Sequence, residues 1–162
     1  MSVRKRSDIE DVRHHVTVRV DAERAYHFFL EQFPSWWPRD FRTTKPGSKL
    51  GVDPRQGGRF YEFDELGGEH TFATLLACDA PRHIEVAWHL NGFGRIDPDP
   101  EHATIFEVRF VSEGATRTRV EVEHTAFERQ GTKHARRVRN GMDKGWPTIL
   151  SEFAAKVEMA LT

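Results

Sequence analysis

An amphipathic C-terminal segment that follows a series of short alternating segments constrains the fold most. Over residues 146–161 the apolar side chains recur at spacings of three and four, which predicts a helix with a wide apolar face. We expect a separate, shorter helix over 132–143, because Pro147 is best tolerated in the first turn of a new helix. The C-terminal helix would reach about 24 Å, enough to cross a sheet.

The earlier part of the chain predicts an antiparallel sheet. Short segments separated by turn residues are expected as strands, and in several of them apolar and polar residues alternate, as is typical of half-buried strands; they are residues 12–20, 49–53, 59–63, 70–78, 83–90, 104–110 and 118–124. One further helix is expected at 22–32, capped by Asp21. A sheet with one apolar face has to be covered. We therefore predict an α+β protein whose curved antiparallel β-sheet wraps around the long C-terminal α-helix, with a cavity between sheet and helix.

Length and composition fit one globular domain over 1–162, with a core of about 12–161. The 24 Lys and Arg residues nearly balance 25 Asp and Glu residues, so the chain lacks the basic excess of a nucleic-acid-binding domain. Cys78 is the only cysteine, which excludes an intrachain disulfide and favours a reducing compartment. The basic residues 1–6 precede no apolar stretch, so we expect no secretory signal, no membrane span and a cytoplasmic protein.

Several stretches resemble one superfamily when they are taken in order. They are Trp36-Trp37-Pro38, the run Arg55–Glu62, Ala80-Pro81 followed by Trp88, the run Thr118–His124, and Gly145-Trp146. Together they resemble the START-like (SRPBCC) superfamily, and within it an uncharacterised bacterial subgroup of the family named after the activator of the Hsp90 ATPase. The resemblance implies a helix-grip fold with a cavity. It does not imply one activity, because relatives bind hydrophobic ligands, act as cyclases or contact a chaperone.

Aromatic residues and two polar residues are the candidates for a ligand-binding cavity: Trp37, Phe60, Glu62, Phe72, Trp88, Phe106, His124 and Trp146. The alternative is that the aromatic residues fill an ordinary core. Glu62 and His124 lie in strands, and His124 shares the apolar face of its strand, where a polar group needs a partner. They are weak candidates for ligand anchors or for an acid–base pair, and we favour satisfied structural hydrogen bonds.

Nine histidines are scattered without the spacing of a metal site, and no phosphate-binding or nucleophile motif is present, so we expect no metal and no cofactor. The leading hypothesis is a binding protein for a small hydrophobic or aromatic ligand. The alternatives are a chaperone-activator-like interaction module, for which the basic run 133–144 would offer a surface, and a cofactor-free enzyme of the cyclase or hydrolase kind. We expect a monomer or a homodimer, and an exposed Trp36–Trp37 region would support the dimer.

Overall fold

The computed structural model describes residues 9–161, and the side chains of residues 9–160. The basic residues 1–6, on which the expectation of no secretory signal depends, lie outside this part. The strands are β1 (Val12–Val18), β2 (Leu50–Val52), β3 (Arg59–Phe63), β4 (Glu69–Asp79), β5 (His83–Trp88), β6 (Thr104–Ser112) and β7 (Thr118–Thr125). The helices are α1 (Ala22–Glu31), α2 (Phe33–Trp36) and α3 (Ala135–Leu161), with single 3-10 turns η1 (Arg39–Phe41), η2 (Pro100–His102) and η3 (Phe127–Gln130).

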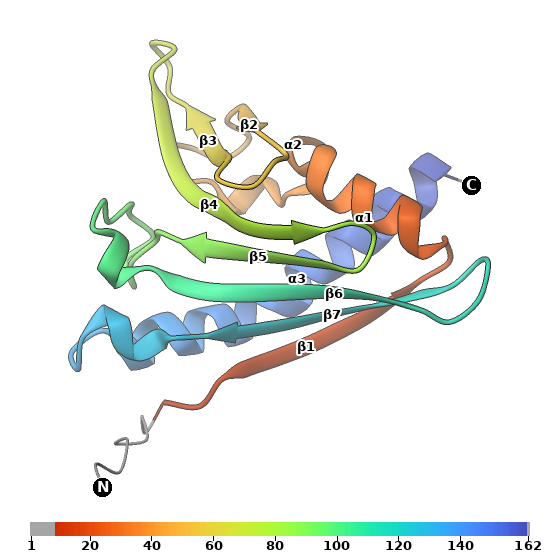
Figure 1. The fold of residues 1–162 in the computed structure, drawn as a ribbon. Coiled ribbons are helices and arrows are strands. Elements are labelled where there is room, and N and C mark those ends of the chain that lie inside the picture. Colours follow the sequence, from red (N-terminus) through yellow and green to blue (C-terminus); the bar gives the residue numbers. More distant parts are fainter. Residues whose placement is uncertain (1–8, 162) are drawn as a thin grey trace, which may run out of the picture.

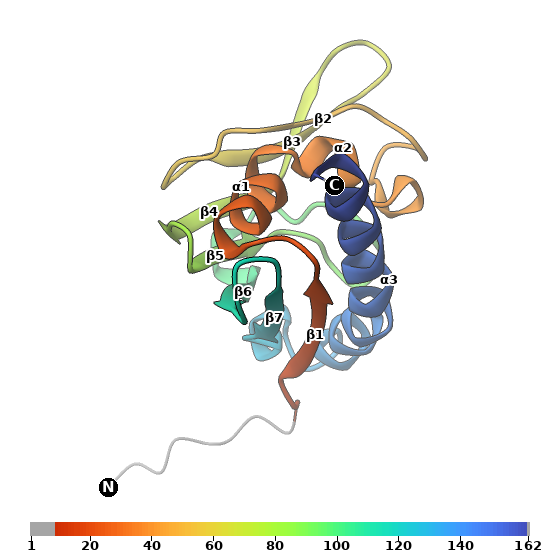
Figure 2. The same ribbon diagram turned by 90° about the vertical axis from the view of Figure 1, so that its right-hand side faces the viewer.

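The strands form one antiparallel sheet in the order β1-β7-β6-β5-β4-β3-β2. The sheet bends along its length, and α1, α2 and α3 lie on its concave side (Figures 1 and 2). The α3 helix runs the length of that side, so the predicted helix-grip fold is confirmed.

Local chemistry explains the element boundaries. The Asp21 carboxylate accepts a hydrogen bond from the Arg24 amide at 2.8 Å and caps α1. In β7 the alternate residues Thr118, Val120, Val122 and His124 are buried against the helices. The Trp146 side chain of α3 contacts His124 of β7. The apolar face of α3 is buried through Trp146, Ile149, Leu150, Phe153 and Val157, each at most 2% exposed.

The break expected before Trp146 does not occur, and α3 continues through Pro147. Pro147 itself is exposed. Proline removes one backbone hydrogen bond from the helix and disfavours its continuation. Buried side chains on both sides, Val138 and Trp146 before it and Ile149 after it, hold the helix against the sheet. Packing therefore outweighs the local preference of proline.

The expectation of an exposed Trp36–Trp37 region is wrong, because Trp36 is 1% and Trp37 4% exposed. Each indole N–H donates to a main-chain carbonyl, Trp36 to Phe29 at 2.9 Å and Trp37 to Phe41 at 3.1 Å. These two side chains belong to the core and offer no surface for a dimer.

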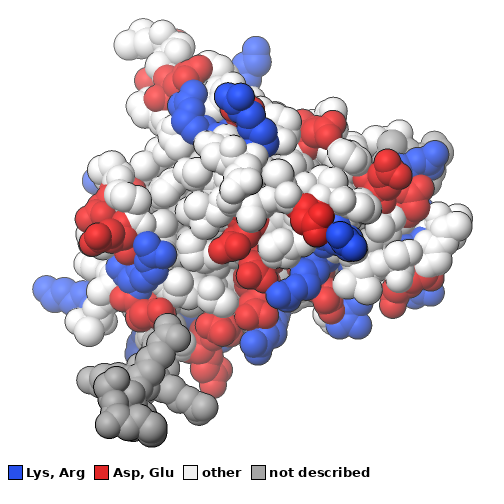
Figure 3. All heavy atoms as spheres, viewed as in Figure 1, with Lys and Arg blue, Asp and Glu red and all other residues white. Residues whose placement is uncertain are grey.

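The convex face of the sheet carries charges of both signs, intermixed over the strands (Figure 3). Arg109 pairs with Glu107 at 2.7 Å, and Arg119 pairs with Glu121 at 3.0 Å. Exposed pairs of this kind contribute little to stability. The face therefore serves solubility and gives no single-sign surface for a polyanion. In the described chain, no helix combines the length and the apolar character that crossing a bilayer requires.

Candidate functional site

A cavity of about 300 Å³ lies between α3, the η1 segment and the end of β5 with its following loop. Its apolar wall consists of Trp37, Trp88, Leu90, Val138, Met142 and Ile149. The volume is at the lower end of the range for small-molecule sites, and an apolar wall with few polar groups is typical of such sites. The cavity communicates with solvent, so a ligand has an entry path.

Glycines keep part of the wall open. Gly141 and Gly145 lie four residues apart on α3, and both line the cavity. A Cβ atom at Gly141 would have no neighbour within 4 Å, whereas one at Gly145 would lie 3.6 Å from the Phe41 ring. Because a glycine inside a helix costs about 1 kcal/mol relative to alanine, the open space beside Gly141 comes at some expense of helix stability.

Two arginines at the rim are engaged in holding the walls. The Arg42 guanidinium donates to the carbonyl oxygens of Ser48, of Trp37 at 2.7 Å and of Pro38 at 3.3 Å. Arg137 donates from Nε to the Gly92 carbonyl at 2.7 Å and lies 4.4 Å from the centre of the exposed Phe93 ring. The β5–β6 loop is thus attached to α3 across the cavity mouth.

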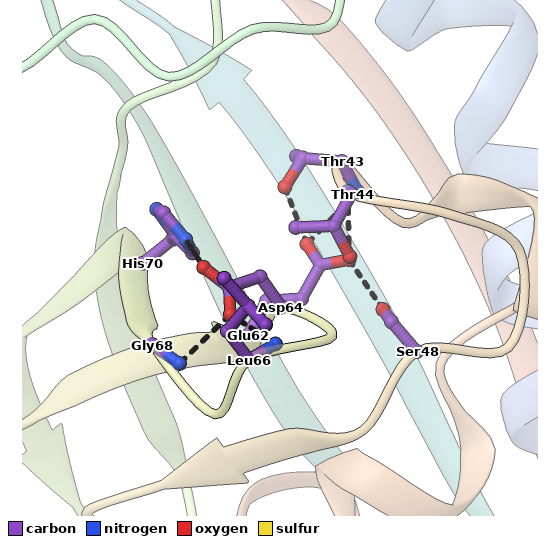
Figure 4. Close-up of polar contacts among 8 residues, drawn as sticks. All are labelled: Thr43, Thr44, Ser48, Glu62, Asp64, Leu66, Gly68 and His70. Carbon is purple, nitrogen blue, oxygen red and sulfur yellow. Dashed lines mark hydrogen bonds and ion pairs between the residues drawn. The ribbon is translucent and has the colours of Figure 1, made fainter.

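Glu62 organises the segment that forms the neighbouring wall (Figure 4). Its carboxylate is buried and accepts hydrogen bonds from the amides of Thr43 and Thr44, both at 2.9 Å. The hydroxyls of Thr43, Thr44 and Ser48 donate to the same two oxygens. Five donors therefore surround one carboxylate and fix residues 43–48 against β3.

The electrostatics of Glu62 agree with this structural task. Burial raises the pKa of Glu62, but the hydrogen bonds from Ser48, Thr43 and Thr44 outweigh it and lower the pKa to about 2. A carboxylate with this pKa is a poor proton acceptor near neutral pH, and its oxygens are already occupied.

His124 is the second buried polar group and is also fully paired. Its Nδ1 accepts from the Trp146 indole N–H at 3.0 Å, which leaves Nε2 protonated and 2.7 Å from the Thr104 hydroxyl. Burial lowers the pKa of His124 to about 3, so the ring is neutral at physiological pH. His124 links β7, β6 and α3 and does not line the cavity.

The structure separates the predicted cavity residues into two groups. Trp37 and Trp88 line the cavity. The other aromatic candidates pack inside the core: Phe60 lies 4.9 Å from Phe33, and Phe106 lies 4.9 Å from Trp146, between ring centres. Phe72 is also a core residue, with its ring 5.6 Å from that of Trp88. Ligand contact by Trp37 and Trp88 stays a prediction.

Several wall residues were not anticipated from the sequence: Phe41, Thr43, Asn91, Gly141 and Met142. The first three lie on irregular segments whose positions depend on tertiary hydrogen bonds. Gly141 and Gly145 carried a usable signal, because two glycines four residues apart inside a helix lack the side chains that would fill the space beside it. Among residues 9–161, no three or more His, Cys, Asp or Glu side chains gather in a way that would hold a metal ion.

Two of the solved structures that resemble this chain share at least 30% identity with it over nearly its full length. CalC from Micromonospora echinospora, described as a self-sacrificing resistance protein, is 56% identical, with 94% of this chain and 96% of that one covered and a TM-score of 0.73. An anthrahydroquino-γ-pyrone synthase, Txn09, is 31% identical over 91% of this chain and 96% of its own, with a TM-score of 0.62.

More distant structures support the fold alone. Protein MLL2253 from Mesorhizobium loti is 17% identical, covers 94% of this chain and 99% of its own, and has a TM-score of 0.62. No curated protein sequence is similar enough to count as a match.

The family profile described as "Activator of Hsp90 ATPase homolog 1-like protein" matches residues 19–158. This range runs from the end of β1 nearly to the end of α3 and thus contains the cavity and the helix that grips it. The chain therefore belongs to this family, within the START-like superfamily, in agreement with its sheet and long C-terminal helix.

Proposed function

We propose that this protein binds a small, mainly apolar toxic molecule in the cavity beside α3. It protects against this molecule by being chemically altered itself, instead of the target that the molecule would otherwise attack. The observation that carries the proposal is the cavity itself, of about 300 Å³, with an aromatic and aliphatic wall and glycines that keep it open. The 56% identity to a self-sacrificing resistance protein supports the protective role.

The buried polar groups favour binding over general acid–base catalysis. Glu62 and His124 have complete sets of hydrogen-bond partners, and their pKa values lie far below neutral pH. A cofactor-free enzyme is the second candidate, because the 31% identical structure is that of a synthase. It would need a proton acceptor other than these two residues.

The chaperone-activator alternative receives less support from the basic run 133–144. Arg137 is bonded to the Gly92 carbonyl, and Arg139 lies near the Glu10 carbonyl and the Asp143 carboxylate. These two guanidinium groups are engaged within the fold, whereas Lys133, Arg136 and Lys144 of the same run are exposed.

Native mass spectrometry after incubation with fractions of an organic extract from the host tests the proposal. We expect a discrete added mass under native conditions, and an altered covalent mass of the protein under denaturing conditions. The matched control is Gly141→Leu, whose side chain enters open space in the cavity and should abolish both signals in a folded protein. Unchanged masses across all fractions would contradict the proposal and would shift attention to a pull-down of partner proteins.

A further inference from the structure

The four tryptophans differ in one respect that bears on the ligand. Trp36 donates its indole N–H to the Phe29 carbonyl, Trp37 to the Phe41 carbonyl and Trp146 to His124 Nδ1. Within the part of the chain that the structure describes, the indole N–H of Trp88 has no acceptor. A buried N–H of this kind usually has a partner, because leaving it unpaired costs free energy.

The Trp88 nitrogen is nevertheless reachable. In residues 9–160, the polar side-chain atoms that are sealed from solvent and make no hydrogen bond are His89 Nδ1 and Arg119 Nε, the latter in an ion pair with the Glu121 carboxylate at 3.0 Å. Trp88 Nε1 is not one of them, although the residue is only 4% exposed. Because Trp88 lies in the wall of the cavity, the cavity is the space that we assign to this nitrogen.

Three other side-chain donors of the cavity wall are engaged in the fold. The Arg42 guanidinium is bonded to three carbonyl groups, and the Thr43 hydroxyl is bonded to Glu62. Arg137 is bonded to the loop at the mouth. Asp40, the carboxylate of the wall, is exposed, so water can solvate it. The Trp88 N–H differs from these groups, because it is a buried donor with apolar surroundings and makes no hydrogen bond within the described chain.

We infer that Trp88 determines ligand specificity by donating its indole N–H to an oxygen acceptor of the ligand, and that the ligand is an apolar ring compound carrying a carbonyl, quinone or ether oxygen. This inference rests on the proposed function, because it concerns the same cavity. An acceptor-free hydrocarbon of the same shape leaves the N–H unpaired. A site with a buried hydrogen-bond donor discriminates against ligand analogues that lack the acceptor atom for that donor.

Solvent exchange of the indole protons gives a first test without any ligand. In protein labelled with ¹⁵N-tryptophan, the four indole signals are assigned by single replacements, with Trp88→Phe identifying Trp88. We expect the Trp88 N–H to exchange with water about tenfold faster or more than the other three, since these are hydrogen-bonded and buried. A Trp88 proton as protected as that of Trp146 overturns the inference, because it would have an internal acceptor.

A matched pair of probes tests the acceptor itself: 9-fluorenone, which carries a carbonyl oxygen, and fluorene, which has a methylene group in its place. In the wild type, fluorenone should bind about two- to tenfold more tightly than fluorene and should move the Trp88 indole signal downfield. In Trp88→Phe the two probes should bind equally. Replacement of Trp88 by β-(3-benzothienyl)alanine, which removes the N–H and keeps the shape, repeats the test in case Trp88→Phe perturbs the core.

The outcomes separate this inference from the proposed function. If both probes bind the wild type equally and neither binds Gly141→Leu, the role of Trp88 is overturned. The cavity would still be shown to bind ligands. A preference for fluorenone that persists without the N–H also overturns it. If neither probe binds, the inference fails, and the proposed function is judged by the extract experiment alone.

Discussion

Lowering the pH from 7.5 to 5 tests whether His124 is the neutral, sealed link between β7, β6 and α3 that the structure describes. Burial lowers the pKa of His124 from an ordinary 6.5 to about 3 in the folded protein. In the unfolded chain the ring regains its ordinary value. Between these two values the unfolded chain binds a proton that the folded protein does not bind, so the free energy of unfolding rises with pH.

The contribution is complete above about pH 6.5 and decreases as the pH falls toward 3. At pH 5 the expected loss from this one residue is about 2 kcal/mol, from a slope that approaches 1.4 kcal/mol per pH unit. Glu62 adds little at this pH, because its stabilising effect is lost only as the pH falls from 4.5 through about 2.

Urea unfolding followed by circular dichroism measures the effect, with wild type and His124→Gln compared at both pH values. We expect the wild type to lose about 2 kcal/mol more than the variant between pH 7.5 and 5. His102, whose pKa is raised by its hydrogen bond to Asp97, titrates in both proteins and cancels in the comparison. Equal losses in the two proteins would show that His124 titrates normally in the folded state, and the account of a sealed ring would be refuted.

Three further substitutions test the fold and the wall of the cavity. Gly141→Ala should raise the melting temperature by about 2–4 °C in a thermal scan, because it removes a helical glycine worth about 1 kcal/mol and meets no atom; no change or a decrease would contradict the open space. Glu62→Gln should cost about 3 kcal/mol in urea unfolding and speed hydrogen exchange of the Thr43 and Thr44 amides, because an amide cannot accept from five donors; unchanged exchange would show that the segment is held otherwise. Asp21→Ala should cost about 1 kcal/mol through loss of the α1 cap, and a loss below a few tenths would mean that the cap is not formed in solution.

The alternating strands could be predicted because burial on one face leaves a direct trace in the sequence. In β7, Thr118, Val120, Val122 and His124 alternate with charged residues, and the structure buries these four. The path of α3 could not be predicted from local preferences. Pro147 disfavours a continuous helix, and only the packing of Trp146 and Ile149 against the sheet explains why α3 continues.

The cavity was harder to predict than the fold, because an aromatic residue in a core and one in a cavity wall have the same strand pattern. Phe106 and Trp88 both point to the concave side of the sheet, yet Phe106 is covered by Trp146 and Trp88 lines the cavity. The difference depends on what lies opposite each ring. Gly141 and the η1 segment share the cavity wall with Trp88. The residues on either side of η1 are held by hydrogen bonds that no sequence pattern specifies, since the Thr43 amide donates to Glu62 and the Arg42 guanidinium donates to the Trp37 carbonyl.

The hydrogen bonds of the buried polar groups distinguish groups that serve the fold from a group that is available to a ligand. Glu62 and His124 were chosen from the sequence because a polar residue among apolar ones invites a functional explanation, and the structure gives each a full set of internal partners. Trp88 was chosen as one aromatic residue among several, and it keeps an N–H without an internal acceptor. A buried polar group whose hydrogen bonds are all made within the fold has a structural role. A buried group that the fold leaves unsatisfied beside an open cavity can take a partner from outside, and we therefore propose Trp88, in preference to the two ionisable residues, as the centre of recognition.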